Sequence, residues 1–511
     1  MRKIFLLLFA ASVYACTKQP EATNSLQDLP IAARVANLSE STTFEEISSI
    51  KIGNLGAAEI SAFDPATKKL FVVNNSSGNN RIDVLDLSNP FAPYLLGAIN
   101  TQIFGGFVNS VAVSKGKLAA GIEAADKVSP GKVVVFTTTD YAVLAEVTVG
   151  SLPDMVTFSP DGNFILSANE GEPNDAYTID PVGSVSIIEV NNNYQVTTLD
   201  FSKFAANEAE LKAKGLRIFG KNASFAQDIE PEYITVSENS KTAWVTLQEN
   251  NAFAEIDLVA KSIVQIHPMG FKDYNSPQNT IDPSDQDGGI FFNSWPVKGI
   301  YQPDAIAVMS HNNVPFVFTA NEGDAREWTG FSEIRRINNS AIVLDPQAFP
   351  NAATLKANAQ LGRLNITTTL GDTDGDGDFD ALYSYGARSF SIWHGRTGKL
   401  IYDSRDFIDK TAAALGKYPD NRSDDKGCEP EGLAIGRVGN NNLLFVGLER
   451  GNAVMVYDVT NPVKPRYLQW LNTGVGPEGV LFVPAPDSPI RKSLLIVSSE
   501  TDGFVKIYTT R

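Results

Sequence analysis

Cysteine and histidine are scarce in this 511-residue chain, which has two cysteines and three histidines. A disulfide framework and a zinc site built from these residues are therefore excluded by count. Positive charge is also in deficit, because 59 Asp and Glu face 42 Lys and Arg and give a net charge of −17. Nucleic-acid binding needs a basic face, so we expect no nucleic acid as the main partner.

Familiar catalytic motifs are absent as well. The sequence contains no G-x-S-x-G, H-E-x-x-H or Walker A pattern. One literal G-x-G-x-x-G at residues 474–479 leads into an apolar, strand-like run and not into a helix, which argues against a dinucleotide site. The sequence therefore shows no recognisable set of nucleophile and base.

Long apolar runs are limited to the N-terminus, where Arg2 and Lys3 precede the apolar residues 4–11. A run this short does not span a bilayer as a stable helix and is typical of a signal peptide. Val13-Tyr14-Ala15-Cys16 follows and resembles a bacterial lipobox, in which lipid is attached to the cysteine. Val13 and Tyr14 differ from the commonest lipobox residues, so an ordinary signal peptide is the alternative.

These features predict three parts of the chain. Residues 1–15 form a signal peptide, residues 16–44 form a tether with lipid on Cys16, and residues 45–511 form the folded domain. The polar and small residues of the tether are typical of a flexible linker. We therefore expect a cell-envelope protein that is held to the membrane by its lipid and faces the periplasm or the cell exterior.

The folded domain repeats a pattern of three apolar runs. Each clear copy opens with a proline–acid pair, and its runs are short and separated by turn residues such as Gly, Asn or Asp. In the copy that begins at Pro153, the runs are MVTFSP, FILSANE and SVSIIEV. Short strands joined by such turns are typical of all-β folds. The clear copies begin at Pro153, Pro231, Pro303, Pro430 and Pro477.

Three less regular copies begin near Glu59, Val108 and Asp380 and bring the number to eight. Repeats of about 40–50 residues with three or four strands are typical of β-propeller blades. The sequence predicts a single closed all-β propeller with eight blades, or seven if one copy is misassigned. The last copy has only three runs, so we expect residues 45–53 to supply its fourth strand. Short helical insertions are expected at residues 201–216, 351–361 and 405–416.

Each clear copy carries two acidic residues that are 16 to 22 positions apart. One follows the opening proline and the other follows the second run, so one strand out and one strand back return the chain to the same edge. We expect these acids to converge on the mouth of the central channel, and Glu59 and Glu123 fit the same pattern. The pairs are Asp154 with Glu170, Glu232 with Glu249, Asp304 with Glu322, Glu431 with Glu449, and Glu478 with Glu500.

Converging carboxylates repel each other unless cations compensate their charge. Arg326 and Arg450 lie beside two of the acids in the sequence, and we expect them to share the channel mouth. The mouth is therefore predicted to bind a metal ion, a cationic ligand or a phosphorylated ligand. The alternative is that each acid only caps a turn through backbone N–H groups.

An acidic loop supplies a second candidate site. From Asp372 it reads D-x-D-x-D-G, the first half of a calcium loop, in which oxygen ligands surround the ion and glycine permits the turn. Position 12 is Tyr383 instead of glutamate, so we expect a calcium loop between β-strands and not an EF-hand. A solvated acidic turn is the alternative. The predicted Ca²⁺ ligands are Asp372, Asp374, Asp376, Asp378 and Asp380.

Several segments in combination resemble the choice-of-anchor I family. They are LPDMVTFSPDGNFILSANEGEPND, YQPDAIAVMS with FTANEGDARE, GDTDGDGDFDALYSYGARSFSIW, and CEPEGLAI with LFVGLERGNAVMVYDV. The resemblance covers roughly residues 45–511 and implies an exported bacterial protein with a propeller-like body and one of several anchoring devices. Some relatives carry alkaline-phosphatase-type labels, and residues 429–432 are faintly similar to calcium-dependent phytase propellers.

Two hypotheses follow. The first is a lipid-anchored propeller, expected to be a monomer, that binds Ca²⁺ and an unidentified small-molecule or surface ligand without catalysis. The second is a calcium-dependent phosphoesterase, in which the acids hold metal ions and Arg326, Arg388 or Arg450 binds phosphate oxygens.

Overall fold

The computed structural model describes residues 40–511, of which residues 41–511 form one compact unit. The predicted signal peptide, the lipidation site Cys16 and nearly all of the predicted tether lie outside the described residues. Among the helices of the described part, none has both the length and the apolar character needed to cross a membrane.

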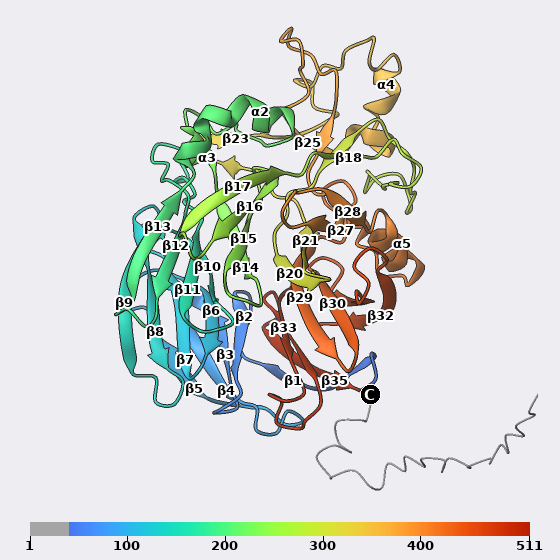
Figure 1. The fold of residues 1–511 in the computed structure, drawn as a ribbon. Coiled ribbons are helices and arrows are strands. Elements are labelled where there is room, and N and C mark those ends of the chain that lie inside the picture. Colours follow the sequence, from blue (N-terminus) through green and yellow to red (C-terminus); the bar gives the residue numbers. More distant parts are fainter. Residues whose placement is uncertain (1–39) are drawn as a thin grey trace, which may run out of the picture. The chain divides into compact units, whose positions relative to one another are not determined.

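Seven antiparallel sheets of four strands succeed one another along the chain (Figure 1). The first three consist of β2 (Ala57–Asp64), β3 (Lys69–Asn74), β4 (Arg81–Asp86) and β5 (Tyr94–Asn100); β6 (Val108–Ser114), β7 (Lys117–Ile122), β8 (Pro130–Thr137) and β9 (Val143–Ser151); and β10 (Pro153–Phe158), β11 (Phe164–Asn169), β12 (Ser184–Glu189) and β13 (Gln195–Asp200).

The other four sheets are given in the same way, from the innermost strand to the outermost strand. They consist of β14 (Pro231–Val236), β15 (Thr242–Leu247), β16 (Ala252–Asp257) and β17 (Ser262–Pro268); β20 (Ile306–His311), β21 (Val314–Asn321), β27 (Ser389–His394) and β28 (Leu400–Asp403); β29 (Pro430–Val438), β30 (Asn441–Leu448), β31 (Ala453–Asp458) and β32 (Arg466–Asn472); and β33 (Pro477–Val483), β34 (Leu494–Ser499), β35 (Phe504–Thr510) and β1 (Phe44–Lys51).

The first strand of each sheet contacts the first strand of the next in cyclic order, from β2 through β6, β10, β14, β20, β29 and β33 back to β2. The approach is close: a Cβ added to Gly479 on β33 would lie 2.4 Å from the backbone oxygen of Glu59 on β2. The middle strands are buried on both faces, as in β34, because each sheet packs between two others. The fold is therefore all-β and propeller-like.

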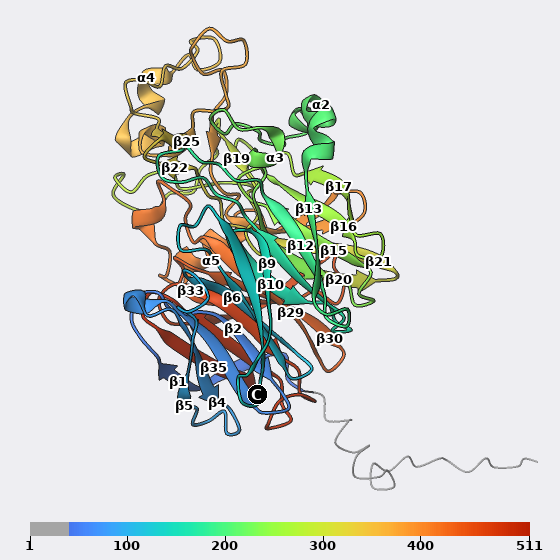
Figure 2. The same cartoon turned by 90° about the vertical axis from the view of Figure 1, so that its left-hand side faces the viewer.

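The predicted fourth strand of the last sheet is present. β1 pairs antiparallel with β35 and becomes the outermost strand of the sheet of β33 and β34. The two ends of the described chain thus meet in one sheet, and β1 and β35 lie side by side in both views (Figures 1 and 2). Phe44 of β1 is buried, and its ring meets that of Phe445 of the neighbouring sheet edge-on at 5.3 Å.

The expected count of eight repeats is wrong for residues 40–511, where the four-stranded sheets number seven. The copy predicted at Asp380 is not a separate sheet, because Ser389–His394 pairs with β21 as its third strand. Residues 339–345, the third apolar run after Pro303 in the sequence, belong to an insertion between β21 and β27. The third strand of this sheet therefore lies beyond the insertion in the sequence. The alternation of apolar and polar residues predicts a strand, but it does not reveal which strand is its partner.

The insertions form a small sheet of their own with a separate hydrophobic cluster that includes Ile337, Leu361 and Ile366. Its strands are β18 (Phe271–Asp273), β19 (Lys298–Ile300), β26 (Tyr383–Ser384), β25 (Asn365–Thr367) and β24 (Ile334–Arg336), and β22 (Glu327–Trp328) pairs with β23 (Phe331–Ser332) beside it. The helices are α2 (Glu208–Ala213), α3 (Phe225–Asp228), α4 (Ala352–Leu355) and α5 (Phe407–Ala414). α2, α4 and α5 confirm the three predicted helical insertions. Both views place α2, α3, α4 and the small sheet beyond the same end of the large sheets (Figures 1 and 2).

Candidate cation-binding site

One residue on each innermost strand, or just before it in the β20 sheet, occupies the same place. We call this set the inner ring. Five of its members follow a proline, and proline suits the first position of a strand because it has no N–H group to pair. In most of the sheets the register shifts at this residue, as between Pro153 and Met155 around Asp154. Such a bulge redirects a side chain. The inner ring is Glu59, Asn109, Asp154, Glu232, Asp304, Glu431 and Glu478.

The inner ring surrounds a cavity of about 140 Å³ at the centre of the sheets. Five of its carboxylates line the cavity, and Ile60, Met155 and Tyr233 lie beneath them. The same three residues also line the next cavity, of about 240 Å³. Ile60, Met155 and Tyr233 therefore lie between the acidic cavity and this second cavity.

A second set of acids, the outer ring, directly follows the second strand of each sheet. Its backbone ties the two rings together: the N–H of Glu170 donates to the carbonyl of Leu152 at 2.8 Å, and that of Glu500 donates to Gly476 at 2.9 Å. The chain thus runs out along the first strand and back along the second to the same edge of the sheet, as predicted. The outer ring is Asn75, Glu123, Glu170, Glu249, Glu322, Glu449 and Glu500.

The two asparagines were not predicted as members of the rings. Each ring contains six acids and one amide, and the two amides fall in neighbouring sheets, at Asn75 and Asn109. Asn75 donates from Nδ2 to Glu59 at 2.9 Å and to the carbonyl of Val108 at 2.9 Å. Aligning all seven copies at their opening residues would have revealed both positions.

Burial and the repulsion of neighbouring carboxylates raise the pKa of most of the ring acids. Burial and the neighbouring Glu500 raise the pKa of Glu59 to about 8. Burial and Glu172 raise the pKa of Asp154 to about 7, and burial and Glu322 raise that of Glu449 to about 7. For the following acids, burial first and other carboxylates second raise the pKa well above its ordinary value: Glu170, Glu232, Asp304, Glu431 and Glu478.

Among the ring acids within residues 40–511, direct ion pairs with lysine or arginine are confined to the outer ring. Lys426 pairs with Glu322 at 2.6 Å, and Arg450 pairs with Glu449 at 2.8 Å. None of the six inner-ring acids forms an ion pair with lysine or arginine within residues 40–511. One carboxylate oxygen of Glu232 and one of Glu431 are buried without a hydrogen-bond partner in that part of the chain.

Arg326 does not compensate the inner ring, which corrects its predicted role. It is 3 % exposed, and its guanidinium binds the carboxylates of Asp228 and Glu230, the latter at 2.8 Å. It lines a separate cavity of about 180 Å³ that reaches the outer ring only at Glu249. The loop after Glu322 directs Arg326 away from the channel, which its closeness in sequence did not indicate. Arg388 likewise binds backbone carbonyls, including that of Ser423 at 2.7 Å.

Glu429 is a residue that the sequence analysis missed. It is fully buried, and it lies with Glu322 and Glu449 in a group whose carboxylate oxygens are within 4.8 Å of one another. Arg422 donates to it at 2.8 Å, and Lys426 lies 3.4 Å away. Its place two residues before Glu431, in a Glu-Pro-Glu sequence, was the available signal.

The acidic loop separates into two groups of possible metal ligands. Asp372, Asp374 and Asp376 form one exposed group, whereas Asp378 and Asp380 form another with Asp345. Asp372 accepts hydrogen bonds from the N–H groups of Gly375 at 2.7 Å and Gly377 at 3.1 Å. The carboxylate groups can serve as oxygen ligands for Ca²⁺, but they do not form the single set of five that was predicted.

Comparison with known proteins gives a match over most of the chain. The family model described as "Choice-of-anchor I domain" matches residues 59–462. Gigasin-3a of Magallana gigas is 28 % identical over 194 residues, which are 31 % of this chain and 67 % of that protein. The mesenchyme-specific cell surface glycoprotein of Strongylocentrotus purpuratus is 28 % identical over 318 residues, 52 % of this chain and 41 % of that protein. The chain thus spans less than half of the second relative.

Solved structures of similar fold have low sequence identity. Hydrazine synthase of Kuenenia stuttgartiensis is 13 % identical, with a TM-score of 0.46 and coverage of 90 % of this chain and 97 % of that chain. The Cps50 (Swd1) β-propeller domain of Myceliophteria thermophila is 9 % identical, with a TM-score of 0.46 and coverage of 92 % and 100 %.

Proposed function

This chain belongs to the choice-of-anchor I family, and on that premise we propose that it is a cell-envelope protein that binds Ca²⁺ and a ligand at its acidic channel mouth, without catalysis. One observation carries the proposal: five carboxylates line one cavity of about 140 Å³ and form no ion pair there within residues 40–511. Ca²⁺ takes six to eight oxygen ligands in flexible geometry. A bound cation would neutralise the repulsion and satisfy the buried oxygens of Glu232 and Glu431.

Closure of the seven sheets into a ring is part of the same proposal. We infer that the seven sheets form one closed ring, and the cyclic contacts from β2 through β33 and back support it. In a closed ring the innermost strands have a common axis, so the bulged acids point to one place.

The calcium loop is a second proposed Ca²⁺ site. The exposed group of Asp372, Asp374 and Asp376 supports it. The neighbouring group of Asp345, Asp378 and Asp380 adds a buried oxygen of Asp378 that has no hydrogen-bond partner in the described part of the chain. Because its ligands are exposed, we expect this site to bind Ca²⁺ more weakly than the channel mouth does.

The channel site predicts a specific change in stability when two acids are neutralised. Glu232→Gln with Glu431→Gln removes two repelling charges, so the melting temperature in EDTA should rise. Excess Ca²⁺ should stabilise the wild type, by about 2.7 kcal/mol at a hundredfold excess over Kd, and should stabilise the double variant far less. Thermal melts with EDTA and with Ca²⁺, supported by calorimetric titration, measure both effects.

Two controls accompany this experiment. Asp374→Asn tests the acidic loop alone, and Glu208→Gln with Glu210→Gln removes two charges on α2 that do not line the cavity of the inner ring. Both control variants should be stabilised by Ca²⁺ as strongly as the wild type. If the acids only cap turns, the double variant would instead lose about 1 kcal/mol for each acid in EDTA and keep the calcium response, and the channel proposal would be wrong.

The stability of the protein without metal should depend on pH at the channel. The folded-state pKa of Glu59 and Asp154 is raised to about 8 and about 7, from ordinary values of 4.5 and 3.8. The contribution of such groups is fully present below their unfolded pKa and is lost as pH rises through the folded pKa. We therefore expect stability in EDTA to fall between pH 5 and pH 8, and Ca²⁺ to stabilise more at pH 8. Urea denaturation at pH 5 and at pH 8 measures the free energy of unfolding. The double variant Glu232→Gln with Glu431→Gln should show a weaker dependence of this free energy on pH.

Attachment to the envelope is proposed through lipid on Cys16, supported by the preceding apolar run and by a relative named as a cell surface glycoprotein. Cys16→Ser should move the protein from the membrane fraction to the soluble fraction after export. Immunoblots of fractionated cells measure the shift. A wild type that is already soluble, or a variant that stays with the membrane, would contradict lipidation.

A calcium-dependent phosphoesterase is the second candidate function. It is favoured by the group of Glu322, Glu429 and Glu449, because Lys426 and Arg450 lie beside these metal-ligand candidates and could bind phosphate oxygens. Hydrolysis of p-nitrophenyl phosphate that requires Ca²⁺ and is lost in Arg450→Gln would support it. No hydrolysis with Ca²⁺ present would leave binding as the function.

A further inference from the structure

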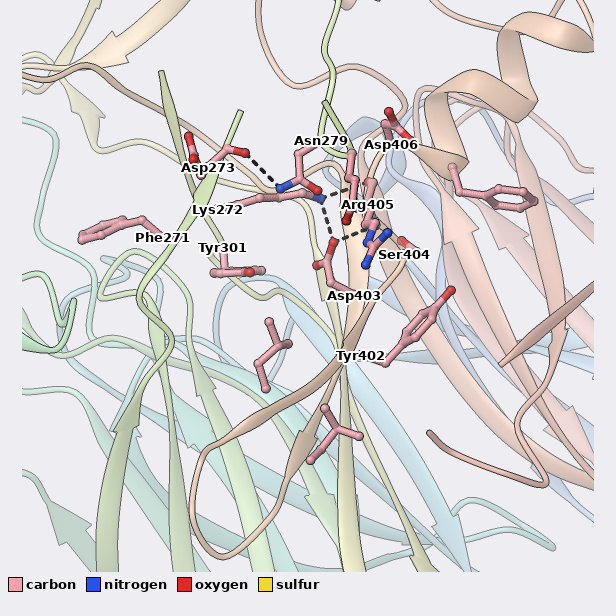
Figure 3. Close-up of a pocket in the computed structure, with 14 residues that line it drawn as sticks. Phe271, Lys272, Asp273, Asn279, Tyr301, Tyr402, Asp403, Ser404, Arg405 and Asp406 are labelled. Atoms are coloured by element: carbon pink, nitrogen blue, oxygen red, sulfur yellow. Dashed lines mark hydrogen bonds and ion pairs between the residues drawn. The ribbon is translucent and has the colours of Figure 1, made fainter. Parts of the chain in front are cut away.

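A larger cavity lies outside the channel, between β18 of the small sheet and β28 at the outer edge of a large sheet (Figure 3). Its volume is about 800 Å³, which is within the usual range for small-molecule sites. One wall comes from residues 271–279 with Tyr301, and the other comes from residues 400–407, which run from β28 into α5. None of the ring acids lines it.

The floor of this cavity is rigid and electrically balanced. Lys272 is 3 % exposed and pairs with Asp403 at 2.9 Å. The same ammonium donates to the carbonyls of Ala387 at 2.9 Å and Arg405 at 3.0 Å, so its three protons are used.

Asp403 is similarly satisfied. One of its oxygens accepts from Lys272 and from the backbone N–H of Arg405 at 2.7 Å, and the other accepts from the hydroxyls of Ser389 at 2.8 Å and Ser391 at 2.7 Å. Asp406 at the rim is paired with Lys410 at 2.6 Å. These charges are therefore cancelled within the protein and are not available to capture an ion.

The groups that remain available to form hydrogen bonds are a hydroxyl, an amide and one guanidinium. Tyr301 is 5 % exposed, and its hydroxyl has no hydrogen-bond partner in the described part of the chain. Arg405 is exposed and lines the pocket, and its backbone has φ of +61°. Asn279 donates one amide proton to the carbonyl of Asp273 at 2.9 Å and retains another.

Aromatic and apolar side chains supply flat surfaces around these groups. Phe407 is 41 % exposed and Leu400 is 38 % exposed, and Phe271 and Tyr402 are half-buried. Figure 3 shows Tyr301 and Tyr402 on opposite sides of the Asp403 carboxylate, with Arg405 above it. Aromatic side chains and hydrogen-bonding groups therefore both line the cavity.

We propose that this pocket binds a neutral oligosaccharide. The C–H faces of a sugar ring pack on aromatic side chains, which combine an apolar body with a polar tip. The sugar hydroxyls donate and accept hydrogen bonds, which suits Tyr301, Asn279 and the opposite charges of Arg405 and Asp273. Because Lys272, Asp403 and Asp406 are already paired within the protein, these three groups offer no ion pair to a charged ligand. The site is independent of the channel and of its proposed cation.

The test is calorimetric titration of the full mature chain with maltohexaose, cellohexaose, xylohexaose and chitohexaose, and with hexagalacturonate as the charged comparison. At least one neutral hexasaccharide should bind with a Kd below about 10 mM. Tyr402→Ala and Arg405→Gly should each weaken it by about tenfold or more. Glycine at position 405 adopts the positive φ without strain, so this variant should keep the fold.

Matched controls separate the pocket from general effects. Tyr94→Ala removes a tyrosine that is 54 % exposed on β5, and Arg491→Gly removes another exposed arginine with φ of +56°; both should leave the affinity unchanged. Three results would overturn the proposal: no neutral hexasaccharide binds, hexagalacturonate binds more tightly than all of them, or binding persists unchanged in both pocket variants.

Discussion

Replacing Arg326 with glutamine is expected to lower the free energy of unfolding by about 3–5 kcal/mol, the cost of breaking a buried ion pair from one side. The arginine and its partners Asp228 and Glu230 are at most 3 % exposed. Arg326 also donates to the backbone carbonyl of Asp228 at 2.8 Å and lies over the ring of Phe219 at 4.5 Å. Without the guanidinium, two carboxylates stay buried without a cation, and one oxygen of Glu230 already has no partner in the described residues.

Urea denaturation of the wild type and variant measures this loss. Arg450→Gln is the control, because Arg450 is 41 % exposed and pairs with Glu449 near the surface, so it should cost less than about 1 kcal/mol. Adding Asp228→Asn and Glu230→Gln to the Arg326 variant should recover part of the stability, since no buried charge then lacks a partner. An Arg326 variant as stable as the control would contradict the buried-pair interpretation.

Replacing Phe44 with alanine is expected to cost about 3–5 kcal/mol, the usual range for a buried phenylalanine. Phe44 has no exposed surface, and its ring packs on Phe445 of the neighbouring sheet. Its backbone N–H donates to the side chain of Gln469 at 2.8 Å, and Gln469 donates back to its carbonyl at 2.8 Å. This residue therefore fixes β1 both to β35 and to the next sheet.

The matched control lies on the same strand. Glu45 is exposed and pairs with Arg511 at 3.5 Å, so Glu45→Ala should change the stability by less than about 0.5 kcal/mol. Deleting residues 40–51 should be more damaging than Phe44→Ala, because it also leaves the edge of β35 unpaired and open to aggregation. Urea denaturation and light scattering measure both effects. A deletion variant that melts like the wild type would show that β1 does not hold the last sheet.

The placement of β1 shows how far the sequence could predict the fold. A final repeat with three runs and a strand-like segment at residues 45–53 were enough to indicate that the two pair, and β1 does pair with β35. The recurring proline–acid pairs likewise indicated the convergence of the acids, because a strand out and a strand back have fixed lengths. Both inferences rest on local patterns and on the rise of a strand.

The number of sheets and the partners of the buried charges needed the tertiary structure. Ser389–His394 pairs with β21 across the insertion, and residues 339–345 do not, because pairing depends on contacts made far away in the sequence. Arg326 lies four residues after Glu322, yet it binds Asp228 and Glu230, about a hundred residues earlier in the chain. The bulges that direct the inner ring toward its cavity are also set by register between strands. The sequence thus determined the repeat and its acidic positions, whereas long-range packing decided which strands pair and which charges are neutralised.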